Sequence, residues 1–334
     1  MSDPLVSILI PAHNVEKWLA ATLESALNQS WANKEIIVVD DGSSDRTLEI
    51  AKAHESRDIK VFRQQKKGAS AARNLALSRA GGEFIQYLDA DDLLDRDKIA
   101  IQVKVLREAE NHNCVTTCSW ARLHDVPKKS EFVPDPVWKT LVSVDLLISS
   151  WAGGGIIPIH AWLTPREIIE RAGPWDETLS TNDDGEYFSR IVLASQRAIF
   201  CPSARCYYRT GRENNLSGRT SLEAYQSIHK SYVLIADRIL KIKDNARARA
   251  AAARVFQSLA YAVYPYSEEL FSRSQQRAQE LGGCDLKPAG GPLFLLLTRV
   301  LGWKKAKKLQ KKAFDIGYKR IAIGRIASGL SKNK

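Results

Sequence analysis

The sequence lacks the features that mark disulfide-rich and secreted proteins. Its five cysteines are an odd number in 334 residues, and the polar start of the chain contains no apolar leader. We therefore expect a cytosolic, reducing compartment. Two local pairs occur, Cys114 with Cys118 and Cys201 with Cys206, and both lie in apolar flanks that read as strands. We interpret them as buried core thiols, with a zinc site as the alternative.

Two glycine-rich phosphate-binding motifs are also absent. No GxGxxG follows the first predicted strand, and GxxxxGK[ST] occurs nowhere in the chain. A phosphate-bearing ligand therefore needs something other than a backbone cradle. A divalent cation that bridges carboxylates to phosphate oxygens would serve this purpose.

Acidic residues are almost missing from the C-terminal segment. The chain has 49 Lys/Arg and 38 Asp/Glu. Residues 291–334 contain 12 of these basic residues and one of the acidic residues, so the rest of the chain is neutral overall. The apolar run in this segment is shorter than the about 20 residues that span a bilayer. An apolar stripe at three- and four-residue steps is formed by Trp303, Ala306, Leu309, Ala313 and Ile316. Because lysines surround this stripe, the pattern predicts an amphipathic helix that lies on an anionic membrane surface. The alternative is a solvated helix packed on the preceding helices.

Short apolar runs alternate with amphipathic ones over the first 110 residues, which is typical of βαβ units and a largely parallel sheet. The predicted strands are residues 6–11, 35–40, 60–62, 84–89, 114–122 and 199–209. Helices are predicted at about residues 18–29, 46–54, 70–79 and 97–110. After Ser221 the pattern is helical only, at residues 222–242, 246–264 and 267–281.

Aspartates cluster where two of the predicted strands end. Asp40 and Asp41 end the second strand, while Asp89, Asp91 and Asp92 follow the fourth. Ligands bind at the carboxyl ends of parallel strands, and carboxylates this close repel one another unless a cation or hydrogen bonds neutralise them. We therefore predict a Mn²⁺ or Mg²⁺ site here with Asp91 as a ligand. Asp92 is interpreted as the N-cap of the next helix.

These segments resemble the donor half of family 2 glycosyltransferases, which have the GT-A fold. The resemblance is carried by PAHNVEKWLAATLESALNQSWANKEIIVVDDGSSDRT, GASAARNLAL and YLDADDLL, and covers about residues 5–110. It implies an α/β protein with a GT-A-like mixed sheet flanked by helices and a C-terminal helical extension. The implied roles are nucleotide-base contacts by Pro11, Ala12, Asn14 and Asp40, a DxD pair in which Asp89 faces the ribose and Asp91 the metal, and a basic residue near the donor, Arg73. Position 13 departs mildly, with histidine where an aromatic residue is commoner.

A second stretch, ERAGPWDETLSTNDDGEYFSRIVLAS, resembles the acceptor-side block of the same family. Its acidic pair is Asp183–Asp184 in place of the usual Glu–Asp. By the resemblance Asp184 is the catalytic base that removes the acceptor hydroxyl's proton, with helix capping as the alternative. Trp151, His160 and Trp162 precede this stretch; they are candidates for stacking on sugar rings, or else core residues.

The segment CYYRTGRENNLSGR, residues 206–219, is similar to the family's closing loop. Arg209 and Ser217 match it, the usual histidine is missing, and Arg212 stands nearby. Arg209 is assigned to the donor diphosphate, which an arginine binds through two hydrogen bonds, with a structural ion pair as the alternative.

The sequence thus predicts an inverting glycosyltransferase that uses a nucleotide-diphosphate sugar, with a UDP-sugar favoured. The acceptor is a hydroxyl of a saccharide or lipid-linked saccharide in cell-surface polysaccharide or glycolipid synthesis. Four regions are expected: a donor half at 1–110, an acceptor half at 111–220, a helical extension at 221–285 and a basic tail at 286–334. We expect a cytoplasmic protein, peripherally associated with the inner face of the membrane through the tail, and no nucleic-acid partner.

Two alternatives come from other functional classes. A sugar nucleotidyltransferase would carry a basic, glycine-rich loop where this chain reads PAHNVEKW. A non-catalytic nucleotide-sugar-binding protein would be favoured if Asp91 or Asp184 were neutral, and both are aspartates here.

Overall fold

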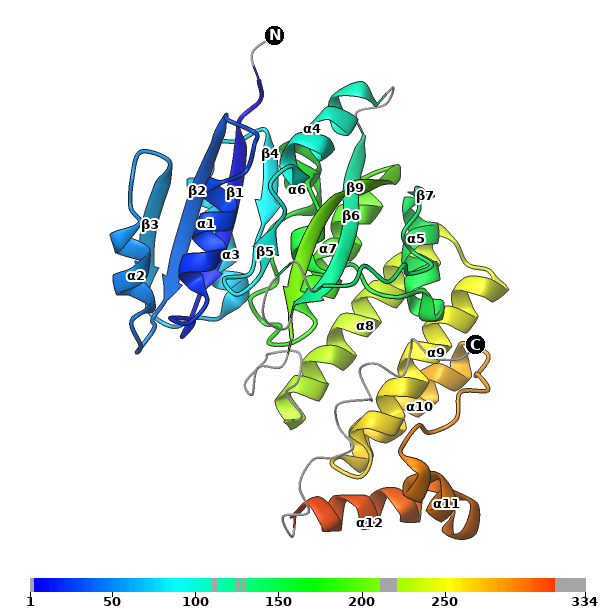
Figure 1. The fold of residues 1–334 in the computed structure, drawn as a ribbon. Helices are drawn as coiled ribbons and strands as arrows, with labels where there is room; N and C mark the ends of the chain where they lie inside the picture. The colour runs from blue at the N-terminus through cyan, green and yellow to red at the C-terminus, as the bar shows by residue number, and fades with distance from the viewer. Residues whose placement is uncertain (1–2, 110–112, 124–126, 128–129, 211–220, 316–334) are drawn as a thin grey trace. The chain divides into compact units, whose positions relative to one another are not determined.

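The chain divides into two compact units in the computed structural model (Figure 1). The structure describes residues 3–109, 113–123, 127, 130–210 and 221–315. One unit contains Met1–Leu147 and Ile156–Arg219, and the other contains Ile148–Gly155 and Thr220–Lys334. Arg212 and Ser217 of the predicted closing loop, and Ile316 of the predicted apolar stripe, lie outside the described residues.

The first unit begins with a five-stranded sheet of order β3-β2-β1-β4-β8. Its strands are β1 (Val6–Ala12), β2 (Lys34–Asp41), β3 (Ile59–Gln64), β4 (Phe84–Tyr87) and β8 (Thr164–Pro165). The first four strands run parallel, and β8 joins the edge of β4 antiparallel. The predicted parallel βαβ start is therefore confirmed, whereas the two-residue strand β8 was too short to show a sequence pattern.

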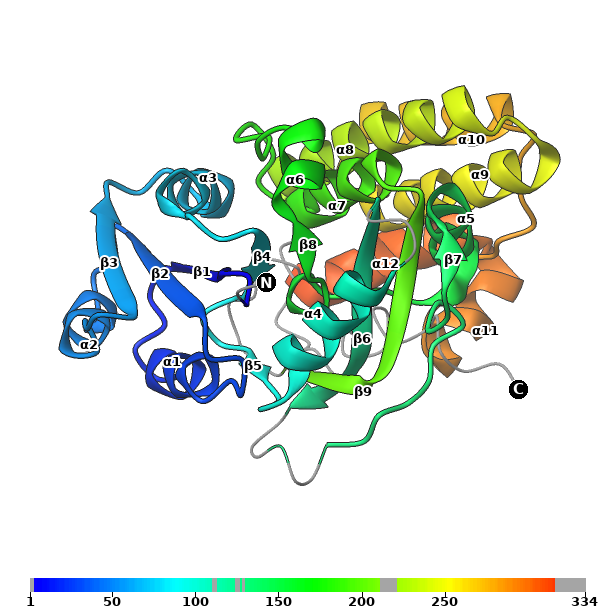
Figure 2. The same cartoon turned by 90° about the horizontal axis from the view of Figure 1, so that it is seen from above.

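Helices cover both faces of this sheet, as Figure 2 shows for α1 and α2 on one face and α3 on the other. Their bounds are α1 (Leu19–Leu27), α2 (Thr47–Ala53) and α3 (Ala69–Arg79), whereas α4 (Lys98–Glu108) packs against β6 (Cys114–Leu123) and β9 (Arg197–Arg209) of a second sheet. Successive strand residues point to opposite faces, so a strand covered on both sides is apolar throughout. In β1, Ile8 belongs to the core that contains Leu19 of α1, while Leu9 belongs to the core that contains Ala72 of α3.

A second, mixed sheet has the order β5-β9-β6, with β7 also paired to β9. Its strands are β5 (Leu93–Leu94), β6 (Cys114–Leu123), β7 (Leu141–Val142) and β9 (Arg197–Arg209). β6 and β9 run parallel, and β5 and β7 run antiparallel to β9. As interpreted from the sequence, the thiols of these strands are free and buried: Cys114, Cys118, Cys201 and Cys206. The unit also contains α6 (Arg166–Ala172) and α7 (Asp183–Ala194), and α5 (Ser143–Ser149) leads out of it.

The second unit is helical, as predicted. It contains α8 (Leu222–Ile242), α9 (Ala246–Val263), α10 (Glu268–Glu280), α11 (Pro292–Leu301) and α12 (Trp303–Asp315). Three of these helices begin with a polar N-cap side chain, which satisfies a backbone N–H that has no partner in the helix. The cap bonds are Ser221 to Ala224 N (3.2 Å), Asn245 to Ala248 N (2.9 Å) and Ser267 to Leu270 N (3.2 Å).

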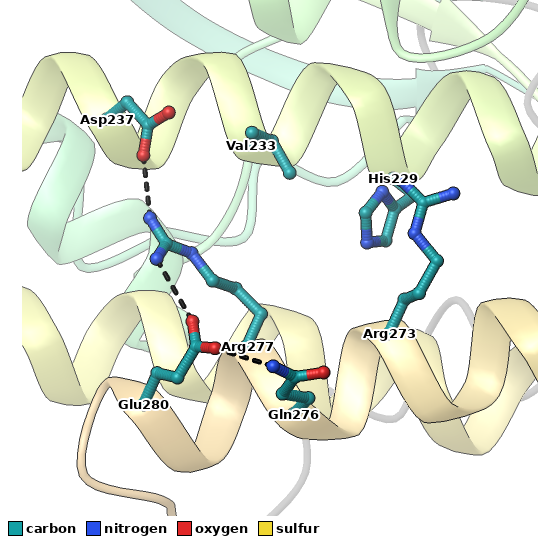
Figure 3. A pocket seen from close by; sticks show the side chains of 7 residues that line it. All are labelled: His229, Val233, Asp237, Arg273, Gln276, Arg277 and Glu280. Atoms are coloured by element: carbon teal, nitrogen blue, oxygen red, sulfur yellow. Dashed lines mark hydrogen bonds and ion pairs between the residues drawn. The ribbon is translucent and has the colours of Figure 1, made fainter.

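A cavity of about 370 Å³ lies between α8 and α10 (Figure 3). The arginine at its centre, Arg277, is 2.7 Å from an Asp237 oxygen and 3.3 Å from a Glu280 oxygen. The lining contains two arginines, Arg273 and Arg277, and two carboxylates, Asp237 and Glu280, so the cavity has no surplus of positive charge for an anionic ligand.

The terminal helix α12 packs the beginning of its predicted apolar stripe on the other helices of the second unit, while Leu309 stays 45% exposed. Trp303 contacts Tyr261, Tyr264 and Phe271 at centroid distances of 4.9, 5.2 and 5.9 Å, and Ala306 is fully buried. For these residues the prediction of a lipid-facing stripe is wrong, because aromatic side chains of α9 and α10 provide a protein surface for them. Within the part of the chain that the structure describes, no helix is both long and apolar enough to cross a bilayer.

Candidate active site

The ends of β1 and β2 are joined by polar contacts. Pro11 and Ala12 end β1, and Asn14 follows with φ 51°, a left-handed conformation that asparagine adopts more readily than most residues. The Asn14 N–H donates to Ser43 Oγ (3.1 Å), and Asn14 Oδ1 accepts from the Ser44 N–H (2.9 Å). The predicted base-binding residues of β1 therefore lie at the same sheet edge as the end of β2.

Asp40 and Asp41 are the last residues of β2, and both are buried. The Asp40 carboxylate accepts from the Ser43 N–H at 3.3 Å and lies 3.4 Å from Arg63 Nε. Asp41 accepts from Gln64 Nε2 (2.7 Å) and from two backbone N–H groups of the loop before α3. Asp41 therefore holds the neighbouring loop, and Asp40 stabilises the turn beside Asn14.

The segment after β4 leads from the first sheet to the second, and Asp92 fixes it there. Asp92 is 1% exposed and His160 is 0% exposed, and Asp92 Oδ2 lies 3.0 Å from His160 Nδ1. Asp92 Oδ1 accepts from the Arg209 N–H at 2.7 Å. The prediction of Asp92 as a helix N-cap is wrong, because its carboxylate bonds to β9 and to a turn before β8 while α4 begins at Lys98.

Arg209, the last residue of β9, stabilises the same segment. Its Nε donates to the backbone oxygen of Asp91 at 2.8 Å, and its guanidinium lies 4.2 Å from the ring centroid of Trp18. Burial raises the pKa of Asp92 to about 6, although the neighbouring His160 opposes this rise. The backbone that presents Asp91 is thus held from both sheets.

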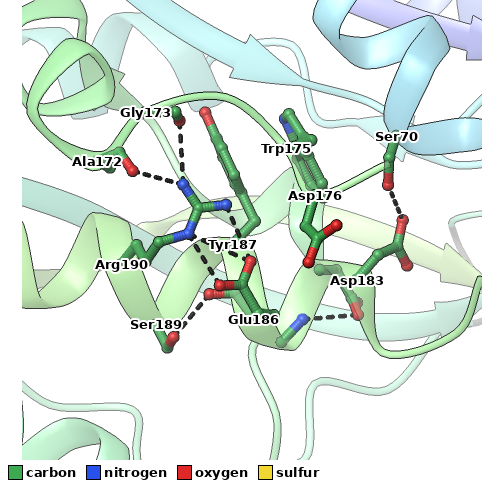
Figure 4. Close-up of polar contacts among 12 residues, drawn as sticks. Ser70, Ala172, Gly173, Trp175, Asp176, Asp183, Glu186, Tyr187, Ser189 and Arg190 are labelled. Carbon is green, nitrogen blue, oxygen red and sulfur yellow. Dashed lines mark hydrogen bonds and ion pairs between the residues drawn. The ribbon is translucent and has the colours of Figure 1, made fainter. Parts of the chain in front are cut away.

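Arg73 of α3 joins the end of β4 to the start of α7. Its NH2 lies 2.9 Å from Asp89 Oδ1, its NH1 lies 2.8 Å from Asp183 Oδ2, and its guanidinium lies 4.5 Å from the centroid of Trp175. Asp183 also accepts from Ser70 Oγ at 3.1 Å (Figure 4). Burial alone lowers the pKa of a guanidinium, but the carboxylates of Asp89 and Asp183 outweigh it and raise the pKa of Arg73, so Arg73 stays charged.

The next residue of α3 holds the segment before α7. Asn74 Nδ2 donates to the backbone oxygen of Trp175 (3.1 Å) and to Glu177 Oε1 (2.8 Å), and Asn74 Oδ1 accepts from the Trp175 N–H (2.9 Å). The Trp175 ring stacks on Tyr187, with centroids 3.9 Å apart and an interplanar angle of 10°. The stretch that resembles the acceptor block is therefore attached to a helix of the donor half.

Asp184 is the second residue of α7 and is exposed to solvent. Its Oδ1 accepts from the Gly185 N–H at 2.8 Å. The protein atoms around it and the adjacent Asp183 raise the pKa of Asp184 to about 6, while Arg73 opposes the rise. A carboxylate with a pKa this close to neutral is suited to accept a proton from a hydroxyl.

The aromatic side chains predicted as acceptor contacts lie elsewhere. Trp162 is 4% exposed and stacks on Phe188 at a centroid distance of 5.1 Å, and His160 is the buried partner of Asp92. Trp151 belongs to the helical unit, where it packs against Tyr232. For His160 and Trp162 the prediction of sugar stacking is wrong, because both rings are enclosed by protein.

Ser70, Asn74 and the Asp92–His160 pair were not predicted as parts of the site. A signal for the first two was present in GASAARNLAL, because Ser70 lies three and four residues before Arg73 and Asn74 and so shares their side of the helix. No comparable signal existed for the pair, which is 68 residues apart in the sequence and meets only in the folded chain.

The residues after β4 fit a divalent cation of the Mg²⁺ or Mn²⁺ kind. Such ions use hard oxygen ligands, and one or two carboxylates plus substrate phosphates satisfy them. Asp89 and Asp91 provide those carboxylates, and both are partly exposed. Among the described residues no group of three or more His, Cys, Asp or Glu side chains is gathered for a metal.

Replacing the buried arginine tests how strongly the two halves are joined. We expect Arg73→Met to lower the free energy of unfolding by about 2–3 kcal/mol, because it leaves Asp183 and the partly exposed Asp89 without their counter-charge. Arg79→Met, at the exposed end of the same helix, should cost no more than about 0.5 kcal/mol. Urea unfolding followed by near-ultraviolet circular dichroism measures both, and equal losses would contradict the role given to Arg73.

Comparison with known proteins finds a family model that matches the N-terminal part of the chain. Residues 7–132 match Glycosyl transferase family 2. The Escherichia coli UDP-Glc:alpha-D-GlcNAc-diphosphoundecaprenol beta-1,3-glucosyltransferase WfgD is 40% identical over 107 residues, which are 32% of this chain and 42% of that protein. Uncharacterized glycosyltransferases of Haemophilus influenzae and Rickettsia species are matched over 19% to 60% of their lengths, so the chain spans only part of these relatives.

Two solved structures extend the likeness to most of the chain. S. aureus TarS 1-349 in complex with UDP-GlcNAc has a TM-score of 0.67 at 17% identity and covers 92% of both chains. The Pyrobaculum calidifontis mannosyltransferase PcManGT, in complex with GDP-Man and Mn²⁺, has a TM-score of 0.56 at 19% identity and covers 96% of this chain and 82% of its own. At these identities the likeness concerns the fold, and it confirms the GT-A fold predicted from the sequence.

Proposed function

We propose that this protein, which through residues 7–132 belongs to glycosyl transferase family 2, transfers a sugar from a nucleotide-diphosphate donor to an acceptor hydroxyl. We favour a UDP-sugar as the donor and inversion at the sugar carbon as the outcome. The observation that carries the proposal is the Arg73 bridge, which places the carboxylates after β4 beside the acidic pair of α7. A transferase needs both groups at one edge of its sheet, one for the donor diphosphate and one for the acceptor.

The donor would bind along the ends of β1, β2 and β4. In this proposal Pro11, Ala12, Asn14 and Asp40 contact the nucleotide base, and their shared position at the sheet edge supports the assignment. Asp89 faces the ribose. Its partial exposure leaves room for such a contact beside Arg73.

Asp91 would hold the metal and Arg209 would reach the diphosphate. A bound divalent cation neutralises the charge that the leaving nucleoside diphosphate develops. Arg209 Nε already donates to the Asp91 backbone oxygen, so the guanidinium lies beside the proposed metal site. This closeness supports a donor-side role over a remote ion pair, because the guanidinium contacts the metal-bearing segment itself.

Asp184 would act as the general base. As the acceptor oxygen attacks the anomeric carbon, its proton passes to an Asp184 oxygen. The bond from that carbon to the diphosphate breaks on the opposite face, and the nucleoside diphosphate leaves with the bonding electrons. A single displacement of this kind inverts the configuration at the sugar carbon. The raised pKa of Asp184 supports the role, since proton transfer is most efficient near the working pH.

The acceptor class and the location are proposed from the tail and from the relatives. The Escherichia coli relative is named for a diphosphoundecaprenol-linked acceptor, and this chain has a strongly basic C-terminal segment. We place the protein in the cytoplasm, peripherally associated with the inner face of the membrane, where it would act on a saccharide or lipid-linked saccharide of a cell-surface polysaccharide or glycolipid. Residues 1–110 would bind the donor, 111–220 the acceptor, and the regions 221–285 and 286–334 would provide the extension and the tail.

A donor screen by product mass tests the class of reaction. The full chain is incubated with Mn²⁺, an undecaprenyl-diphosphate or soluble saccharide acceptor, and UDP-, GDP- or dTDP-sugars in turn. We expect one donor, a UDP-sugar, to give an acceptor heavier by one glycosyl residue together with free nucleoside diphosphate, and chelation to stop the reaction. A nucleotidyltransferase would instead form nucleotide sugar from a sugar phosphate and a nucleoside triphosphate. A non-catalytic binding protein would bind the donor without forming any product.

A further inference from the structure

Helix α11 presents an uncovered apolar face. Leu293, Leu296 and Val300 recur at three- and four-residue steps and are 69%, 57% and 73% exposed. That spacing places them on one side of the helix. Single exposed apolar residues are ordinary on a protein surface, but three large ones along one side of a single helix form a patch.

The opposite side of α11 is attached to the helical unit. Phe294 is buried, and Lys307 Nζ of α12 lies 5.8 Å from its ring centroid. α12 is in turn fastened by Trp303 against the aromatic side chains of α9 and α10. Figure 1 shows α11 and α12 next to each other at the end of this unit. These buried contacts therefore fix α11 in the helical unit, and the exposed apolar face takes no part in them.

Positively charged side chains occur on α11 itself and on the adjoining helix α12. Arg299 on α11 is exposed, and so are four lysines of the adjoining α12: Lys304, Lys305, Lys308 and Lys312. Residues 291–334 together contain 12 Lys/Arg and one acid. An apolar patch accompanied by these exposed cations matches the interface of an anionic bilayer, which has negatively charged headgroups above an apolar acyl region. A protein partner would require acidic side chains around an apolar groove, whereas a membrane offers both properties everywhere.

We infer that the Leu293–Leu296–Val300 face of α11 inserts into an anionic lipid surface while the lysines of α12 contact the headgroups. The inference rests on the peripheral location proposed above and names the surface responsible for it. The contact surface differs from the stripe predicted from the sequence, since Trp303 and Ala306 of α12 are used for packing. α11 would lie in the plane of the interface, because its ten residues are too few to span a bilayer.

Vesicle co-sedimentation of the full chain tests this surface. The probes are vesicles of phosphatidylcholine mixed with phosphatidylglycerol, against phosphatidylcholine alone. We expect the wild-type chain to bind the anionic vesicles and to weaken with added salt. Leu296→Asp/Val300→Asp should lower the partition coefficient at least tenfold. The matched control is Ile242→Asp, because Ile242 ends α8 in the same unit with the same 57% exposure as Leu296, and it should bind as the wild type does. Lys305→Gln/Lys312→Gln should reduce binding and flatten the salt dependence.

Three results would overturn the inference. The first is no binding by the wild-type chain, and the second is unchanged binding by Leu296→Asp/Val300→Asp, which would move the contact to other residues. The third is a wild-type dimer that the double variant converts to a monomer without a membrane effect, which would make the face an interface between copies. Transfer to a water-soluble acceptor without vesicles separates this inference from the proposed reaction. The double variant should keep that activity. Loss of transfer in every variant would contradict the proposed transfer reaction and would leave the proposed membrane contact untouched.

Discussion

Asp184→Asn should lower turnover by about two to four orders of magnitude, the usual contribution of a general base. The amide cannot accept the acceptor hydroxyl's proton, although it can still accept the Gly185 N–H bond that Asp184 accepts now. Donor affinity should stay within a factor of about two, because Asp184 is not among the proposed donor contacts. Steady-state turnover with the acceptor identified by the donor screen, and calorimetry with the donor, measure the two quantities.

The pH dependence separates a base from a helix cap. With a pKa of about 6, Asp184 is deprotonated above pH 6 and protonated below it, so kcat/KM should fall as pH decreases through about 6. Asp183→Asn removes the like charge that raises this pKa, so the fall should move to lower pH. Asp58→Asn, an exposed aspartate before β3, is the matched control and should change neither turnover nor profile. Near-normal turnover in Asp184→Asn would reduce Asp184 to a helix-terminal residue.

Asp91→Asn should weaken nucleoside diphosphate binding in the presence of Mn²⁺ by more than tenfold, or about 1.4 kcal/mol. Asp91 is partly exposed, and the segment that carries it is held by Arg209, which donates to the Asp91 backbone oxygen, and by the contact of Asp92 with His160. These contacts do not use the Asp91 carboxylate, so Asp91→Asn leaves them in place. Binding without metal should hardly change, since the variant keeps the base-binding edge of β1 and β2.

Titration calorimetry with a nucleoside diphosphate, with and without Mn²⁺, measures this difference. Asp97→Asn is the control, because Asp97 is an exposed aspartate at the start of α4 whose side chain makes no capping bond. It should bind like the wild type in both conditions. Equal metal-supported affinity in Asp91→Asn and Asp97→Asn would remove Asp91 from the metal site.

The sequence predicted the parallel half of the fold because its signals are local. In β1 and β2 continuous apolar runs end in turn residues, and the glycine at the end of β2, Gly42, has φ 66° with Lys66 N only 2.8 Å from the position of a Cβ. The long helices α8 to α10 were equally visible, since each combines amphipathic spacing with a Ser or Asn cap. β5, β7 and β8 were not predicted, because strands of two residues carry no period and form only where a neighbour offers its edge.

For the site, the sequence singled out candidate carboxylates and gave the wrong partner for one of them. Asp89, Asp91 and Asp184 were predicted because clustered acids at strand and helix ends repel one another unless a ligand or hydrogen bonds neutralise them. Asp92 was predicted as a cap because aspartate before an apolar run is typical of one. Its actual partner, His160, comes from a distant turn, and both side chains are buried. Long-range polar pairs of this kind depend on tertiary packing, which a single sequence does not reveal.

A chimera that joins residues 1–110 of this protein to the following segment of a relative would place new residues against α3. Arg73 would keep Asp89 but meet the relative's residue at position 183, and Asn74 would meet the relative's backbone in place of that of Trp175. A successful exchange would have to retain an acid and a matching backbone turn at those points. In this protein, segments could therefore be exchanged without loss of the attachment to α3 only where residues 175–184 stay intact.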